Sequence, residues 1–148
     1  MGASGWHYFT DYEPDLRVVL DRLHRQAFGA GEYYWPDDDE DDSWEPVRPA
    51  TLERLLADAA VASTGTHSVL DIVRVVAPGE SDGFGTLRHL MPEEVHRLFG
   101  TAMPTREQFL HRLSTLGDFG QRWSGYCVVL DNGVGGMRQL AVWGYSGD

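Results

Sequence analysis

Lysine is missing from this 148-residue chain, and isoleucine, asparagine and cysteine each occur once, as Ile72, Asn132 and Cys127. The codons of lysine, isoleucine and asparagine are rich in A and T, so their scarcity indicates a bacterial genome of high GC content and no particular function. A single cysteine excludes a disulfide within the chain and gives no sign of an oxidising compartment. The chain needs no such link, because its length suffices for an ordinary hydrophobic core.

Long apolar runs are lacking as well. No stretch approaches the roughly 18 apolar residues of a membrane span, and Met1 to Gly5 carry neither a basic region nor an apolar run of signal-peptide length. These absences predict a soluble, cytoplasmic protein that does not bind membranes.

Positive charge is scarce, since 12 arginines face 23 acidic residues and the net charge is −11. Such a chain repels a phosphate backbone, which argues against binding to nucleic acid. Aromatic residues nevertheless make up 11% of the chain, and their large rings serve either packing or contact with another molecule.

Apolar periodicity and turn residues predict the order of the elements. Trp6 to Phe9 is typical of a strand, and a helix follows Pro14 with Leu16, Val19, Leu20, Leu23 and Ala27 on one face. Further expected elements are a short helix from about Thr51, a buried strand over 69–76, a short strand over 86–90, helices over 92–99 and 105–116, and a terminal hairpin over 123–130 and 138–145. The order predicts one α+β domain over residues 1–148, with a mainly antiparallel sheet and about four helices.

A strongly acidic segment interrupts this pattern. Residues 36–50 contain three prolines and six consecutive acids, which predicts an exposed loop within the domain. Aromatic residues flank the acids, and aromatic anchors beside carboxylates form a surface that attracts and then holds a basic protein. The candidate partner-binding residues are Tyr33, Tyr34, Trp35, Asp37, Asp38, Asp39, Glu40, Asp41, Asp42 and Trp44.

A polar turn offers candidate catalytic residues. Gly65-Thr66-His67-Ser68 places one imidazole and two hydroxyls at the expected start of a strand, with Asp71 four residues beyond His67 on the same strand face. The alternative, which we prefer, is a turn whose hydroxyls cap nearby backbone groups.

Cys127 is the other candidate nucleophile, if a histidine such as His67 lies within hydrogen-bond reach. A buried cysteine of a strand is the simpler interpretation, because free cysteine is among the most buried residue types. Neither a metal site nor a cofactor-binding motif is indicated. The acidic residues of 37–42 lack the spacing of a calcium loop. The glycine-rich segments 83–85 and 133–136 do not open a helix as a phosphate-binding loop does.

Four segments resemble a group of small bacterial proteins to which no activity is assigned: residues 2–6, 33–35, 65–71 and 143–148. This resemblance implies no catalytic residue. More loosely, the small size, acidity and scattered Trp and Tyr are similar to immunity proteins that neutralise bacterial toxins.

We therefore expect an acidic protein-protein interaction module, of which a toxin-neutralising protein is one example. The alternative is a small enzyme or ligand-binding protein with a site around His67, Ser68 and Asp71. An exposed aromatic patch beside the acids favours the first, and a pocket in which the polar side chains converge favours the second.

Overall fold

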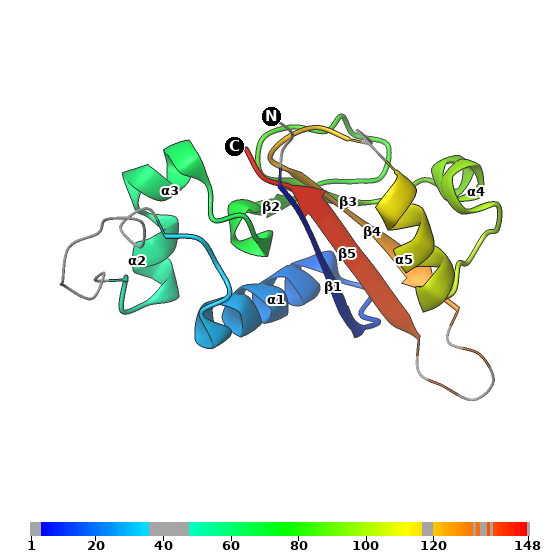
Figure 1. Cartoon of the computed structure of the whole chain (residues 1–148), viewed down its shortest axis with the longest axis horizontal. Helices are drawn as coiled ribbons and strands as arrows, with labels where there is room; N and C mark the ends of the chain where they lie inside the picture. The colour runs from blue at the N-terminus through cyan, green and yellow to red at the C-terminus, as the bar shows by residue number, and fades with distance from the viewer. Residues whose placement is uncertain are drawn as a thin grey trace.

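The structure, a computed structural model, describes residues 4–35, 48–116, 120–131, 133, 136 and 138–147. These residues form a mixed α/β fold around a single sheet, with helices packed against both faces of the sheet (Figure 1). The strands are β1 (Gly5–Asp11), β2 (Arg74–Val75), β3 (Thr86–His89), β4 (Ser124–Leu130) and β5 (Gln139–Tyr145). The helices are α1 (Leu16–Ala30), α2 (Leu52–Leu56), α3 (Ala59–Thr64), the 3₁₀ turn η2 (Val69–Asp71), α4 (Pro92–Phe99) and α5 (Arg106–Thr115).

The strand order is β1-β5-β4-β3-β2, and the sheet is mixed instead of mainly antiparallel as expected. β5 pairs antiparallel with β4, which confirms the terminal hairpin, and it also pairs antiparallel with β1. β3, however, is parallel to both β4 and β2. The physical reason is the connection, because α4 and α5 lie between β3 and β4 and carry the chain back for a parallel crossover.

Helix α1 packs on one face of the sheet as its periodicity predicts. The Asp15 carboxylate caps its first turn by accepting from the Arg17 backbone N–H at 2.9 Å, and Gly31 ends it in the left-handed conformation that favours glycine. The buried side chains of α1 are Leu16, Val19, Leu20, Leu23, His24 and Ala27. They join a hydrophobic cluster with alternate residues of the strands, such as Trp6 and Val142.

Helices α4 and α5 cover the opposite face. Pro92 opens α4, and a reciprocal capping box between Thr105 and Gln108 starts α5, as the sequence predicts. Phe109 is fully buried and meets Trp143 edge to face at 5.3 Å between ring centroids. The sheet is thus buried on both sides, which explains why β4 and β5 are almost continuously buried.

Two expected elements differ. The strand expected over 69–76 is limited to β2, because the Ser68 hydroxyl accepts from the Leu70 backbone N–H and caps η2 in place of an extended start. The helix expected from Thr51 divides into α2 and α3. Within the described ranges, no helix is long and apolar enough to cross a membrane.

Candidate functional site

The polar turn between α3 and η2 brings together three of its side chains. Asp71 Oδ1 accepts from the Thr66 backbone N–H at 2.6 Å and from the Thr66 hydroxyl at 2.8 Å. The Thr66 and Ser68 hydroxyl oxygens are 2.7 Å apart. Because the single Thr66 hydroxyl proton points to Asp71, Ser68 donates to Thr66, and the hydroxyls form a directed chain that ends at the carboxylate.

This cluster is closed to solvent. Thr66, Ser68 and Asp71 are only 0%, 1% and 4% exposed. Burial raises the pKa of the Asp71 carboxyl, and this effect outweighs the hydrogen bonds from Thr66, which lower the pKa. Its second oxygen, Oδ2, is buried without a hydrogen-bond partner in the described structure. A substrate therefore cannot reach the hydroxyls of this turn as it stands, and their contacts serve the backbone.

The backbone of the turn takes a conformation that few residues adopt. Gly65 has a φ of 76°, and a Cβ there would lie 3.0 Å from the Trp123 ring and 3.1 Å from Asp71 Oδ2. His67 follows with a φ of 53°, in the left-handed region that is costly for a residue with a side chain. Such strain persists only where neighbouring contacts hold it, and here the Thr66, Ser68 and Asp71 contacts do so.

The strained turn presents His67 to an aromatic neighbour instead of to Ser68 or Cys127. The His67 ring stacks on the Tyr34 ring, with 4.9 Å between centroids and 22° between planes. The Tyr34 backbone N–H also donates to the Thr66 carbonyl at 2.8 Å. The arrangement therefore joins His67, a predicted catalytic residue, to Tyr34, a predicted partner-binding residue. Asp71 lies in η2, which corrects the expectation that it shares a strand face with His67.

Tyr33 forms a second stack beside the first. Its ring is parallel to that of Phe28, with 6.1 Å between centroids, and the Arg48 guanidinium lies 4.6 Å from its centroid. Arg48 also donates to the Gly31 carbonyl at 3.0 Å. The rings of Tyr33, Tyr34 and His67 are all partly exposed. We call these three residues the aromatic platform.

The other predicted partner-binding residues are placed differently. Trp35 is only 6% exposed and belongs to the hydrophobic cluster beneath α1, which corrects its expected place on the surface. Its indole is large and the adjacent core is apolar, so burial outweighs exposure beside the acids. Asp37 to Asp42 and Trp44 lie outside the described residues.

Cys127 is fully buried in β4, which confirms its interpretation as a cysteine of the core. The histidine that contacts it is His89 and not His67, with 3.1 Å between Sγ and Nδ1, because the parallel register pairs these two residues. Burial raises the pKa of the Cys127 thiol and lowers the pKa of His89. Both shifts favour a neutral pair, so the geometry does not activate the thiol.

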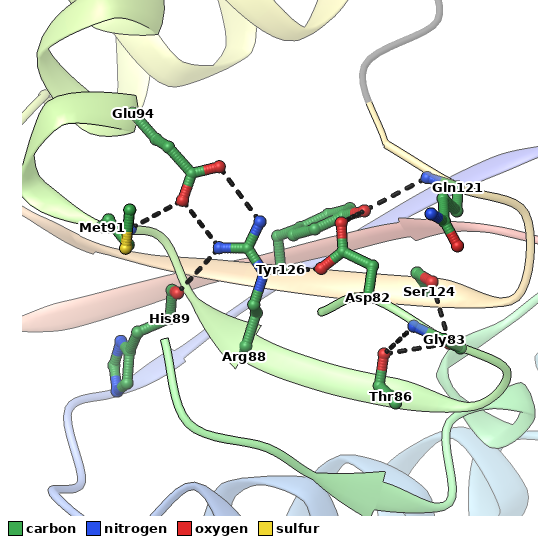
Figure 2. A network of polar contacts seen from close by, with 10 residues as sticks. All are labelled: Asp82, Gly83, Thr86, Arg88, His89, Met91, Glu94, Gln121, Ser124 and Tyr126. Atoms are coloured by element: carbon green, nitrogen blue, oxygen red, sulfur yellow. Dashed lines mark hydrogen bonds and ion pairs between the residues drawn. The ribbon is translucent and has the colours of Figure 1, made fainter. Parts of the chain in front are cut away.

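A further polar network, which sequence reasoning missed, centres on Arg88 in β3 (Figure 2). Its guanidinium donates to Asp82 at 2.6 Å and to both carboxylate oxygens of Glu94, at 2.7 and 3.0 Å. Asp82 also accepts from the Tyr126 hydroxyl at 2.9 Å. The hydrogen bond from Arg88 lowers the pKa of Glu94. The one guanidinium holds both carboxylates, so this network ties α4 and the 78–85 connection to the sheet.

One cue to this network was present in the sequence. Arg88 is the one arginine of the short strand expected over 86–90, and a charge that a strand buries requires partners. Which acids supply them depends on how the 78–85 connection and α4 fold back onto β3, which local patterns do not show.

Within the described residues, no three His, Cys, Asp or Glu side chains group as metal ligands do. Comparisons of the chain with models of protein families, with curated proteins and with solved structures find no match. The interpretation of the site therefore depends on its geometry and charge.

Proposed function

We propose that this chain is an acidic protein-binding module that holds a basic protein through the aromatic platform and the acidic segment 36–47. Neutralisation of a basic toxin is one function of this kind. The proposal depends on a single arrangement: the described residues on either side of the acidic segment lie at the platform. Trp35 is buried directly before the segment, and Arg48, directly after it, contacts the Tyr33 ring and the Gly31 carbonyl.

Chain connectivity then confines the acids to this part of the molecule. Consecutive Cα atoms are about 3.8 Å apart, so the Cα of Asp37 lies within about 8 Å of the Cα of Trp35 in any conformation. Six of the 23 acidic residues of the chain stand at 37–42. A basic partner steered by these charges therefore arrives beside partly exposed aromatic rings, which supply the short-range contact.

The platform is also suited to rigid contact. Tyr34 and His67 are stacked, and the Thr66, Ser68 and Asp71 hydrogen bonds hold the backbone that carries them. Rings that are ordered before binding lose little conformational entropy when they meet a partner. The burial of Ser68 and Thr66 argues against the alternative of an enzyme around His67, Ser68 and Asp71.

The first experiment is a pull-down at low salt from a lysate of the source organism, followed by binding kinetics with the retained protein. Deleting Asp37 to Asp42 removes six charges and changes the net charge from −11 to −5. We expect this deletion to slow association, and salt to have the same effect on the intact chain. Tyr34→Ala should instead speed dissociation about tenfold, because a ring at an interface acts at short range.

Tyr12→Ala is the matched control, since Tyr12 is a 40% exposed tyrosine that directly follows β1 and does not belong to the platform. If no basic protein is retained, or if the retained protein binds the deleted form and the Tyr34→Ala form with unchanged rates, the proposal is wrong. The genomic neighbourhood gives independent information, because the gene of an immunity protein stands beside that of its toxin.

A further inference from the structure

One edge of the sheet is a long strand that has no strand beyond it in the described structure. The two edges are β1 and β2 (Figure 1). β2 covers only two residues, and a very short strand is one of the ways in which proteins protect an edge from association. β1 covers seven residues, Gly5–Asp11, and pairs with β5 without interruption. Its outer side is therefore a long and regular row of backbone groups.

The middle of this outer row offers unused hydrogen-bonding groups. Directly after β1, the Tyr12 N–H donates to the Arg138 carbonyl on the β5 side at 2.9 Å. Residues of an antiparallel strand direct their backbone groups alternately to one side and the other. The N–H and C=O of the odd-numbered residues His7 and Phe9 therefore point away from β5, and no described residue bonds to them.

The side chains in the middle of β1 do not protect the edge either. His7 is exposed and Phe9 is half-buried, and their rings lie edge to face with 5.8 Å between centroids. Natural edge strands are commonly protected by proline, by charged side chains or by a bulge. β1 contains no proline, its pairing with β5 has no bulge, and its only charged residue, Asp11, is the last one. An edge of this kind is suited to pairing with another strand.

The charges along β1 permit a second copy of the chain to approach. The Arg22 guanidinium donates to the Thr10 hydroxyl at 3.0 Å and to the Asp11 carbonyl at 3.3 Å. The Arg106 guanidinium lies 3.9 Å from the centroid of the Phe9 ring. Two arginines thus offset the one acid of the strand, although the whole chain has a net charge of −11.

We propose that β1 pairs antiparallel with β1 of a second copy, about a two-fold axis through Tyr8. This register uses all seven residues of the strand and places His7 of each copy opposite Phe9 of the other, so that each such pair exchanges both main-chain hydrogen bonds. The His7 and Phe9 rings of both copies then lie on one face of the continuous sheet, where they form cross-strand pairs.

The same register keeps the acids of the two strands apart. Each Asp11 stands opposite Gly5 of the other copy, so the two Asp11 residues are about 20 Å apart at about 3.4 Å per residue. This separation exceeds the Debye length of about 8 Å at physiological ionic strength, so their repulsion is largely screened. The interface uses no residue of the aromatic platform and does not depend on the proposed binding of a basic protein.

Sedimentation equilibrium of the chain from micromolar concentration to about 1 mM tests the proposal, and we expect a dimer that dissociates on dilution. His7→Pro removes an outward N–H that the sheet does not use, so the variant should fold, as circular dichroism can verify. Each dimer then lacks two hydrogen bonds, which should raise the dissociation constant at least about tenfold. His7→Gln keeps the N–H and is the matched control.

His7→Glu tests the same contact without any change of the backbone. Its carboxylate would stand diagonally across from Asp11 of the second copy, so the dimer should weaken, most clearly at low salt. The neutral His7→Gln variant is again the control. This variant decides the question if His7→Pro does not fold.

A cysteine at the two-fold axis tests the register. In Tyr8→Cys the two new thiols face each other with Cα atoms about 4.5 Å apart, which suits a disulfide. In Tyr12→Cys, the matched control, the two residues are about 27 Å apart in the same register. Cys127 is fully buried and does not interfere. We expect mild oxidation to link Tyr8→Cys into a covalent dimer much faster than Tyr12→Cys.

Three outcomes would overturn the proposal. The first is a wild-type chain that stays monomeric at about 1 mM. The second is a dimer whose dissociation constant is the same in the folded His7→Pro and His7→Glu variants as in His7→Gln. The third is equally fast oxidative cross-linking of Tyr8→Cys and Tyr12→Cys, which would place the contact elsewhere or in another register.

Discussion

Replacing Arg88 by Met is the sharpest test of how α4 and the 78–85 connection are held to the sheet. The side chains of Arg88, Asp82 and Glu94 are only 8%, 17% and 14% exposed. Met fills a similar volume but leaves both carboxylates without their cation. Removing one partner of a buried ion pair costs about 3–5 kcal/mol. Because the two acids keep some contact with water, we expect a loss near the lower end, about 3 kcal/mol.

The loss should depend on pH, and its sign follows from Glu94. The hydrogen bond from Arg88 lowers the pKa of Glu94 in the folded chain. Its contribution to stability is therefore present above the unfolded pKa, about 4.3, and disappears as the pH falls through the lower folded value. Without Arg88 this contribution is absent at every pH. The difference between wild type and variant should thus be largest near neutral pH and shrink below about pH 4.

Urea unfolding of both proteins between pH 7 and pH 3.5 measures this difference. Arg25→Met is the matched control, because Arg25 also pairs with a carboxylate, Asp21, at 3.2 Å, but on an exposed helix face. An exposed pair of this spacing contributes about 0.3–0.5 kcal/mol. If Arg88→Met costs no more than this control at neutral pH, or if its cost does not change with pH, the network does not hold the fold as we argue.

Three further predictions concern other parts of the fold. Leu20→Ala removes a side chain that is 7% exposed in α1 and should destabilise the chain by about 2–5 kcal/mol in urea unfolding. A loss below about 0.5 kcal/mol would mean that α1 packs by another face. Gly65→Ala should destabilise the fold, because φ is 76° and the new Cβ would lie 3.0 Å from the Trp123 ring. Gly29→Ala should stabilise the fold by up to about 1 kcal/mol, because Gly29 lies within α1 and a Cβ there meets no other atom within 4 Å. Thermal unfolding of this pair compares them directly, and equal effects would contradict the strained turn. Cys127 should react with a thiol reagent only as fast as the chain opens, because it is fully buried, and rapid labelling of the native protein would refute that burial.

The sequence predicts those elements whose signals are local. The face of α1 follows from the spacing of Leu16, Leu20 and Leu23, and the start of α5 follows from the Thr105–Gln108 pair. The terminal hairpin follows from two β-prone runs around a glycine-rich turn. In each case residues close in sequence determine the structure, so no knowledge of distant contacts is needed.

The errors arise where distant contacts or single side chains decide. Residues 69–76 are rich in β-branched residues, but the Ser68 cap and the hydrogen bonds to Asp71 turn the chain into η2. The orientation of β3 depends on the crossover through α4 and α5. Trp35 was expected beside the acids on the surface, and its burial depends on a core built mostly from α1 and the sheet. A local side-chain cap overrides strand preference at the first place, and distant contacts decide at the other two.

The polar turn shows why residue type alone gave two interpretations of one motif. A histidine, two hydroxyls and a carboxylate within seven residues suit hydrolysis and suit a capped turn equally well, because both need hydrogen bonds among the same groups. Burial separates them: the hydroxyls point inward to Asp71, and only the His67 ring reaches the surface, where it stacks on Tyr34.

The distance over which the acidic segment acts sets the conditions for testing the binding proposal. By contour length alone, 12 residues between described neighbours that both lie at the platform span at most about 20 Å outward from it, since an extended residue spans about 3.5 Å. The Debye length is about 8 Å at physiological ionic strength and about 30 Å at 0.01 M salt. At physiological salt, therefore, only acids close to the platform act on a partner there, whereas at 0.01 M all six act together. The binding proposal therefore predicts that association accelerates strongly as salt is removed, while dissociation, which the proposal assigns to contact with the Tyr34 and His67 rings, changes little. A partner whose dissociation rate follows salt as steeply as its association rate would place the acids, and not the rings, in the bound contact.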